Sequence, residues 1–284
     1  MAEPARTSAQ RTRLPLAVEG LVDKKTAGKQ EGNALTMKGS LVITGGSRGI
    51  GAATAILAAS RGYKVCLGYL RNEVAAAGVV AEISRAGGQA IAVAADVGDE
   101  AQVAAMFDRA ETELGPLCGL VNNAGILESQ AVFSAIDVAR FYRLLRTNLI
   151  GPFICAKEAL RRMSTARGGA GGAIVNVSSV AARTGAPFEY VDYAASKGAL
   201  DSLTAGLARE AAPVGVRVNL VRPGFIYTEM HAAGGEPDRV DRLANTIPMA
   251  RGGKPDEVAR AIVWLLSDSA SYAVGTTIGV TGGI

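Results

Sequence analysis

The sequence predicts an α/β protein built on one doubly wound sheet of seven parallel strands with helices on both faces. Two patterns lead to this fold class. From residue 40 onward, short and continuously apolar runs alternate with longer alanine-rich segments. Strands covered on both faces are continuously apolar, and strand–helix alternation is typical of parallel sheets joined by right-handed crossovers. The composition agrees, since 49% of the residues are hydrophobic and 35 are glycine, which suits a buried core with many tight turns.

Each apolar run predicts one strand, and each longer segment between two runs predicts one helix. The predicted strands cover residues 41–44, 64–68, 90–94, 119–122, 173–177, 217–221 and 277–280. The predicted helices cover residues 50–60, 73–86, 100–113, 137–163, 191–211 and 256–267. The glycine-rich run at 168–172 is then a turn between a helix and a strand, so residues 37–284 are expected to form a single domain.

Residues 1–36 differ from the rest, because they are polar, mixed in charge and without sustained periodicity. Their apolar piece at 14–18 ends at Glu19 and is too short for the apolar core of a secretory signal. We therefore expect a flexible N-terminal extension. An arginine-bearing transit peptide is the alternative, and Met37 is a second candidate start of translation.

The net charge of +4 does not indicate a nucleic-acid partner. Residues 1–38 hold seven of the 30 basic and four of the 26 acidic residues, which leaves 23 against 22 in the remainder. No apolar run reaches the ~18 residues of a membrane span, so we expect a cytoplasmic protein with no membrane partner. Cys66, Cys118 and Cys155 are far apart in apolar runs, which indicates reduced core thiols rather than disulfides or metal ligands.

A glycine-rich turn follows the first predicted strand. It contains Gly45, Gly49 and Gly51 and leads directly into an alanine-rich helix. Glycine lets the backbone approach a pyrophosphate closely, and a helix N-terminus offers free N–H donors and the positive end of a dipole. Asp96-Val97 and Asn122-Asn123-Ala124-Gly125 close the third and fourth strands, at the edge where doubly wound sheets bind ligands. Asp96 is a candidate acceptor for an adenine amino group, and Asn122 a candidate brace between strands; each alone also fits ordinary turn chemistry.

Tyr193 and Lys197 lie four residues apart in a predicted helix, which places both side chains on one face. A free phenol has a pKa of about 10, and a cation about 4 Å away at an effective dielectric of about 20 favours the phenolate by up to about 4 kcal/mol. The pair therefore predicts a phenol whose pKa is lowered toward neutrality, able to exchange a proton with an alcohol or carbonyl oxygen. Taken alone, the pair also fits an ordinary helix surface.

In this order, the motifs resemble the short-chain dehydrogenase/reductase family over residues 39 to 284. The resemblance rests on Thr44-Gly45-x-x-x-Gly49-x-Gly51, Asn122-Asn123-Ala124-Gly125, Tyr193-x-x-x-Lys197 and Pro223-Gly224-x-x-x-Thr228. It implies a Rossmann-type domain that binds NAD or NADP and moves a hydride to or from a carbonyl carbon. Within the family, the sequence is similar to glucose-dehydrogenase-like members, and a 3-oxoacyl-ACP-reductase-like member is the alternative.

The resemblance assigns Tyr193 as general acid/base and Lys197 as the residue that holds the nicotinamide ribose and lowers the tyrosine pKa. Ser179 would orient the substrate oxygen, and Asn148 would hold a water that relays protons. Ser179 precedes Tyr193 by 14 positions, one more than the commonest family spacing, so we place the extra residue in loop 185–191 and keep Ser178 as the alternative serine. Asn148 alone also fits an asparagine bonded locally inside a helix. The expected cofactor contacts are Gly45, Ser47, Arg48, Gly49, Ile50, Gly51, Arg71, Asp96, Val97, Asn123, Ala124, Gly125, Pro223, Gly224, Ile226 and Thr228.

NADP is preferred over NAD as the expected cofactor, although NAD stays open. No acid follows the second strand before Glu73, whereas family members that prefer NAD usually place one there. Arg48 and Arg71 are instead suited to a 2′-phosphate. Arg71 also fits the start of an exposed helix. The stretch 229–250 corresponds to the family's substrate lid, and Glu189, Tyr190 and His231 are candidate contacts for a polar carbonyl or hydroxyl substrate.

The helices at 137–163 and 191–211 also predict assembly. The second is rich in small residues on nearly every side, and the resemblance makes the two helices a dimer contact, with the last strand completing a homotetramer. A non-enzymatic dinucleotide sensor on the same fold is the main alternative, but such proteins are expected to lose the serine, tyrosine or lysine. A Ser-His-Asp hydrolase would have to depend on His231, the only histidine, which lies in a loop-like setting.

Overall fold

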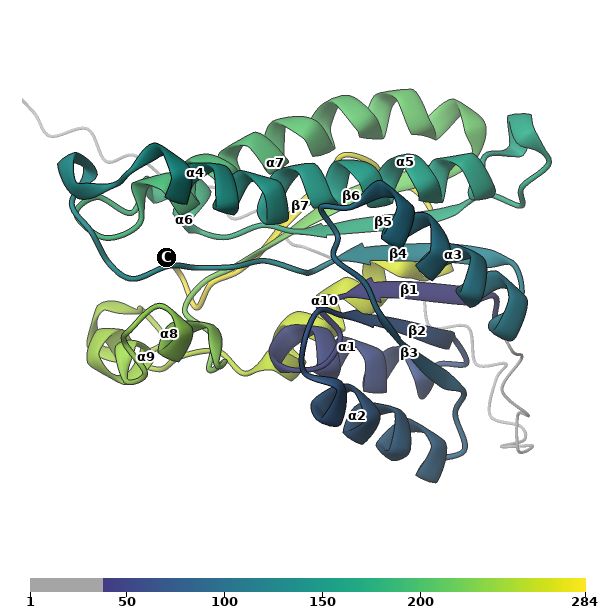
Figure 1. The fold of residues 1–284 in the computed structure, drawn as a ribbon, viewed down its shortest axis with the longest axis horizontal. Coiled ribbons are helices and arrows are strands. Elements are labelled where there is room, and N and C mark those ends of the chain that lie inside the picture. Colours follow the sequence, from purple (N-terminus) through teal and green to yellow (C-terminus); the bar gives the residue numbers. More distant parts are fainter. Residues whose placement is uncertain (1–37) are drawn as a thin grey trace, which may run out of the picture. The chain divides into compact units, whose positions relative to one another are not determined.

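The computed structural model describes residues 38–284, so the extension expected at 1–36 lies outside the described residues. Their strands form one sheet in the order β3-β2-β1-β4-β5-β6-β7, and every neighbouring pair is parallel. The strand order reverses between β1 and β4, which is the switch point where doubly wound sheets bind ligands. The predicted fold class is confirmed (Figure 1). The strands are β1 Ser40–Thr44, β2 Lys64–Tyr69, β3 Ala90–Ala94, β4 Leu117–Asn122, β5 Gly172–Val177, β6 Val216–Pro223 and β7 Thr277–Val280.

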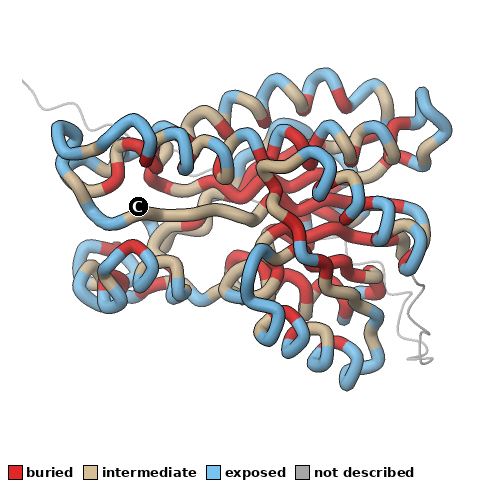
Figure 2. The backbone as a smooth tube through the Cα atoms, viewed as in Figure 1, coloured by how far each residue is buried: buried red, intermediate tan, exposed pale blue. Residues whose placement is uncertain are grey.

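Helices cover both faces of the sheet (Figure 1). One face carries α1 Gly49–Ala59, α2 Glu73–Arg85 and α10 Pro255–Leu266, and the other carries α3 Glu100–Leu114, α5 Gly151–Met163 and α7 Val191–Ala211. The sheet interior is apolar on both faces, as Leu41, Val42 and Ile43 of β1 show by being fully buried. Figure 2 shows burial concentrated in the strands and the inner faces of these helices, with exposure along their outer faces. The four shorter helices are α4 Val138–Leu145, α6 Ala181–Thr184, α8 Met230–Ala233 and α9 Arg239–Leu243.

The helix predicted at 137–163 is not continuous. It divides into α4 and α5, and a π-helical turn at Arg146–Ile150 separates them. Pro152 explains the break, because proline has no N–H to donate to the carbonyl four residues earlier and its ring crowds the preceding turn. π-turns of this kind are frequent at functional sites, and Asn148 lies in the middle of this one.

Buried amides tie the central strands to the helices on one face. Asn122 Nδ2 donates to Asn176 Oδ1 at 2.9 Å and to Pro152 O at 3.2 Å, and Asn176 Nδ2 donates to Thr204 Oγ1 at 2.8 Å. Asn122 therefore links β4 to β5 and to the start of α5, as the sequence predicted, and Asn176 extends the link to α7. All three side chains are almost fully buried, so these bonds have little water to compete with them.

The three cysteines lie apart and unpaired, two of them fully buried. No helix within residues 38–284 is both long and apolar enough to span a bilayer.

Candidate active site

The turn after β1 is a glycine-rich cradle, with glycine at positions 45, 46, 49 and 51. Gly45 and Gly49 have φ values of +63° and +53°, which L side chains rarely adopt. A Cβ on Gly51 would lie 2.2 Å from the Gly45 carbonyl oxygen, so only glycine fits there. The N-cap residue of α1, Arg48, makes no side-chain capping bond and the first turn holds no acid. The first N–H groups of α1 are therefore not capped by any side chain, which fits a pyrophosphate.

Strand β4 holds this turn in place. Asn123 Nδ2 donates to the carbonyl oxygens of Thr44 and Gly45, both at 3.0 Å, and Thr44 Oγ1 accepts from the backbone N–H groups of Asn123 and Ala124. The Asn123 side chain is thus engaged with the turn, and its contribution to a cofactor site is to fix the shape of the cradle.

The segment after β6, residues 224–228, lies on the other side of the cradle. A Cβ on Gly49 would lie 3.2 Å from Thr228 Cγ2, so Thr228 is in direct contact range of the glycine turn. Gly224 packs equally closely on the backbone of Thr281. Ile226 is buried and forms an isolated parallel bridge with Gly253. The glycine turn and the segment after β6, nearly 180 residues apart in the chain, therefore meet at the place predicted for one dinucleotide site.

Helix α7 carries Tyr193 in its first turn and Lys197 in its second. Both are almost fully buried, and Lys197 Nζ lies 5.8 Å from the centroid of the Tyr193 ring. The ammonium donates to the carbonyl oxygen of Val177 at 2.8 Å, at the end of β5. A Cβ on Gly125 would lie 3.5 Å from Lys197 Nζ, so the segment after β4 reaches the same place. The two side chains predicted to work together therefore do lie together, between the ends of β4 and β5.

The predicted lowering of the tyrosine pKa is wrong for the protein groups alone. Burial raises the pKa of the Tyr193 phenol to about 12, and a hydrogen bond with Ser179 acts in the opposite direction. Burial lowers the pKa of Lys197 to about 8, and the Asp201 carboxylate opposes that shift. Desolvation disfavours the charged form of each group, and it is the largest cause of both shifts.

The structure separates the two candidate serines. Ser179 lies close enough to the Tyr193 phenol to lower its pKa, and its hydroxyl accepts from Ala181 N at 3.1 Å. Ser178 points elsewhere, since its hydroxyl donates to Asp201 Oδ1. Ser179 is therefore the serine that lies beside the phenol, in agreement with the choice made from the spacing.

Asn148 is bonded over long range and not within its own helix. Its Oδ1 accepts from Ile126 N at 2.8 Å, and its Nδ2 donates to Ile126 O at 3.0 Å and Ser196 Oγ at 3.2 Å. A Cβ on Gly125 would lie 3.4 Å from its Oδ1. The π-turn thus places this amide beside Lys197, where the resemblance expected it.

Residues at the ends of β2 and β3 differ in their availability. Arg48 and Arg71 are exposed, and neither forms an ion pair within residues 38–284. Asp96 is engaged, because its carboxylate pairs with Arg146 at 2.6 Å and accepts from Gly98 N at 2.9 Å. Val97 packs against the start of α5, since a Cβ on Gly151 would lie 2.6 Å from Val97 Cγ2. The adenine contact predicted for Asp96 would have to share a carboxylate that already has partners.

Charged side chains connect the lid to the loop before α7. Arg239 of α9 is 5% exposed and pairs with Glu189 and Glu236. Its guanidinium lies 4.9 Å from the ring centroid of Tyr190 and 5.4 Å from that of Phe225. Glu189 and Tyr190, predicted as substrate contacts, are thus used to hold the lid.

His231 lies at the root of the lid. Its Nε2 bonds the Ile226 carbonyl oxygen at 3.0 Å, whereas its buried Nδ1 has no partner within residues 38–284. Burial lowers the pKa of this imidazole. The ring ties the lid to Ile226, one of the expected cofactor contacts.

Two ion pairs beside the site were not predicted. Arg140 of α4 binds Asp192 in a bidentate pair, with Nε–Oδ2 at 2.6 Å and Nη2–Oδ1 at 3.3 Å. Arg222 of β6 binds Asp201 of α7. No direct signal in the sequence pointed to either pair. The spacing indicated only that Asp201, four residues after Lys197, lies on the same side of the helix as the lysine.

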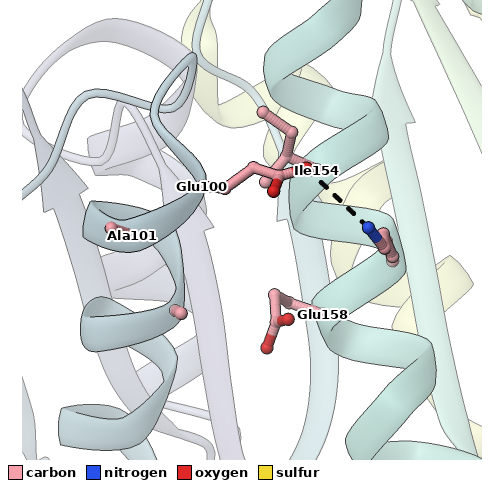
Figure 3. A pocket seen from close by; sticks show the side chains of 6 residues that line it. Glu100, Ala101, Ile154 and Glu158 are labelled. Carbon is pink, nitrogen blue, oxygen red and sulfur yellow. Dashed lines mark ion pairs between the residues drawn. The ribbon is translucent and has the colours of Figure 1, made fainter.

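A surface hollow of about 350 Å³ between α3 and α5 contains none of the predicted site residues. Figure 3 shows Glu100 and Ala101 on one side and Ile154 and Glu158 on the other, with the Glu100–Lys157 ion pair, 3.7 Å long, crossing it. Both partners of that pair are well exposed, so this hollow is a feature of the helical surface and not of the chemistry.

Comparisons with known proteins find relatives along most of this chain. The profile of the family described as "Enoyl-(Acyl carrier protein) reductase" matches residues 45–284. The uncharacterized oxidoreductase YgfF of Escherichia coli K12 is 58% identical over 242 residues, covering 85% of this chain and 98% of that protein. The cis-4-hydroxycyclohexanecarboxylate dehydrogenase of Sinomonas cyclohexanicum is 43% identical over 242 residues, covering 85% and 94%. A Staphylococcus aureus 3-oxoacyl-(acyl-carrier-protein) reductase, FabG, is 36% identical over 250 residues, covering 88% and 99%.

Solved structures agree as well. A short-chain type dehydrogenase/reductase from Mycobacterium marinum superimposes with a TM-score of 0.81 at 34% identity, covering 87% of this chain and 95% of that one.

Proposed function

The chain belongs to the short-chain dehydrogenase/reductase family, and from this premise we propose that it transfers a hydride between NADP and a carbonyl or secondary alcohol. The observation that carries the proposal is the convergence of Ser179, Tyr193 and Lys197 on the segment after β4, which also holds the glycine turn through Asn123. The bound nicotinamide would supply or accept the hydride. The protein groups would bind, orient and manage the proton.

The protonated state of Tyr193 favours carbonyl reduction. With a pKa raised to about 12, the phenol keeps its proton at neutral pH and is a donor to a carbonyl oxygen. Ser179, which lies beside the phenol, would hold that oxygen and stabilise the negative charge that develops on it. Alcohol oxidation needs the phenolate instead, so the oxidative rate should rise as pH rises, in the direction that ionises Tyr193.

The test of this role is the Tyr193→Phe variant, which keeps the ring and removes the acidic proton. We expect turnover to be lost while binding of reduced cofactor, followed by its fluorescence, stays near the wild-type value. Tyr272→Phe is the matched control, because Tyr272 is fully exposed and should tolerate the change. Retained turnover in Tyr193→Phe would remove the assigned role.

The choice of NADP is supported by the cations near the ribose end of the site. Arg48 and Arg71 are exposed and have no ion-pair partners within residues 38–284, and β2 ends without an acid. A charge-assisted hydrogen bond contributes about 1.5–3 kcal/mol, so Arg71→Gln should lower kcat/KM for NADPH by roughly 10- to 100-fold and leave that for NADH nearly unchanged. Arg85→Gln, at the exposed far end of α2, is the control. A wild-type preference for NADH would contradict the proposal.

A panel of ketones, aldehydes, sugars and 3-oxoacyl thioesters, followed at the absorbance band of reduced nicotinamide, would identify the substrate. Two relatives are named for a cyclic hydroxy acid and for a 3-oxoacyl chain carried on acyl carrier protein. We propose a secondary alcohol or ketone within this range. A cytoplasmic location stays a prediction.

We also propose a homotetramer. Gly198 and Gly206 of α7 have open space where a Cβ would stand, which leaves a flat strip for a second helix. Tyr142 and Phe153 are exposed on the neighbouring α4 and α5, and Val274 is exposed shortly before β7. Light scattering on the purified chain would give four times the monomer mass; a monomer would contradict the assignment.

A further inference from the structure

Asp201 lies one helical turn after Lys197, on the same side of α7. Its two carboxylate oxygens have different partners. Oδ1 accepts from Ser178 Oγ and Oδ2 accepts from Arg222 Nη2, each at 2.5 Å. Ser178 also lies 3.4 Å from the carbonyl oxygen of Lys197. The carboxylate is therefore fixed from two strands, β5 and β6, at the base of the lysine that the proposed function places in the site.

The arginine of this pair is in an unusual place. Arg222 is the next-to-last residue of β6, two positions before Gly224, and its side chain is 17% exposed. Its Nε is buried with no hydrogen-bond partner within residues 38–284. A guanidinium that is mostly withdrawn from water is costly unless a carboxylate balances it. The Arg222–Asp201 ion pair is thus largely buried between β6 and α7 and is not a surface contact.

Lys197 needs a negative neighbour. It is 3% exposed, and the acceptor recorded for its ammonium is a neutral carbonyl, that of Val177. The groups placed around its side chain are the Val177 carbonyl at the end of β5, the Asn148 amide of the π-turn and the Tyr193 ring of α7. Asp201 follows one helical turn later, and its carboxylate is held by Ser178, the residue directly after Val177, and by Arg222 of β6. Asp201 is the one acid in this set.

We propose that Asp201 and Arg222 act as a positioning pair for Lys197, in which the fixed carboxylate keeps the buried ammonium charged and Arg222 limits how strongly it does so. The proposal rests on the proposed function of Lys197. Burial lowers the pKa of Lys197 to about 8 and Asp201 raises it, in agreement with this assignment. Removing the two partners should therefore act in opposite directions. Asp201→Asn removes the attraction, while Arg222→Met removes a nearby positive charge and leaves the carboxylate unbalanced.

The decisive measurement does not depend on turnover. The full-length protein, labelled with ¹³C at lysine Cε, is titrated by NMR, and the Lys197 signal is assigned by its loss in Lys197→Met. We expect Asp201→Asn to move the Lys197 midpoint to lower pH by about one unit, the lower end of the effect of a close opposite charge, and Arg222→Met to move it to higher pH. Glu210→Gln, at the exposed end of the same helix, removes a charge without reaching Lys197 and should leave the midpoint unchanged.

An unchanged Lys197 midpoint in a folded Asp201→Asn protein would overturn the proposal, as would shifts of the same sign in both variants. Asp201→Asn alone is sufficient if Arg222→Met does not fold. Kinetics then connect the pair to the proposed function: the alkaline limb of kcat/KM for ketone reduction should move by the same amount and in the same direction as the NMR midpoint. An absence of nicotinamide-dependent turnover in the wild type would count against the proposed function, and the NMR result would still decide the role of Asp201.

Discussion

The buried pair Arg140–Asp192 permits a quantitative prediction. Both side chains are less than 10% exposed, the contact is bidentate, and Arg140 Nη1 also donates to the Ser129 carbonyl oxygen at 2.7 Å. Asp192 Oδ1 in turn accepts from the N–H of Tyr193 at 2.9 Å. The pair therefore fixes the first turn of α7, which carries the proposed general acid, to α4 and the loop after β4.

Removing one partner leaves the other charge buried and uncompensated. Asp192→Asn should lower the free energy of unfolding by about 3–5 kcal/mol, the usual cost of breaking a buried pair from one side. In a chain of this size about 2–4 °C is lost per kcal/mol, so the melting temperature should fall by roughly 6–20 °C. The double variant Arg140→Met/Asp192→Leu should recover most of the loss, because apolar replacements of a buried pair are often close to neutral.

Urea unfolding of wild type, Arg140→Met, Asp192→Leu and the double variant Arg140→Met/Asp192→Leu closes a double-mutant cycle and gives the interaction free energy. The control is Arg109→Met, since the Arg109–Glu113 pair on α3 is 53% and 40% exposed and should contribute at most about 1 kcal/mol. The reasoning is refuted if Asp192→Asn costs no more than this control, or if the double variant loses the sum of the two single losses.

Three further outcomes are expected. Gly51→Ala should abolish binding of reduced dinucleotide by fluorescence titration, because its Cβ would meet a carbonyl oxygen at 2.2 Å, whereas Gly78→Ala, with open space around it, should bind normally. Arg239→Met should release the lid and make residues 230–247 the first site of limited proteolysis; unchanged cleavage would show that the ion pairs do not hold it. Burial raises the pKa of Cys66 and Cys155 to about 12, so these thiols should react with a thiol reagent at pH 8 only after unfolding, and stability should fall above pH 9, where the unfolded thiols ionise and the native ones do not.

Much of the fold was open to prediction because its signals are local. The strands of a parallel sheet are continuous apolar runs, and β1 to β7 all fall within or close to the predicted ranges. The strand ends likewise place the glycine turn and the Tyr193 helix on one edge of the sheet. The break before α5 could have been predicted, because proline interrupts helices and Pro152 lies at that point. The π-turn itself could not, because Asn148 within it is bonded to Ile126 and Ser196, which are distant in the chain.

The electrostatics of the site could not be read from spacing. The spacing of four between Tyr193 and Lys197 predicted their proximity correctly, yet gave the wrong sign for the phenol pKa. The desolvation that decides the sign comes from segments distant in the chain that cover the pair. The pairing of Glu189 with Arg239 is hidden for the same reason, because 50 residues separate the partners and only the folded lid brings them together.

The buried amide link from Asn122 through Asn176 to Thr204 has a consequence for motion. If α7 were to lift from the sheet, it would leave a carboxamide donor without water in the most protected layer of the molecule, a cost of about 1–3 kcal/mol beyond the lost packing. Breathing of the helix is thus coupled to breathing of the central strands. Helix α7 and the central strands should therefore exchange their amide hydrogens as one cooperative unit. The lid should exchange independently of them.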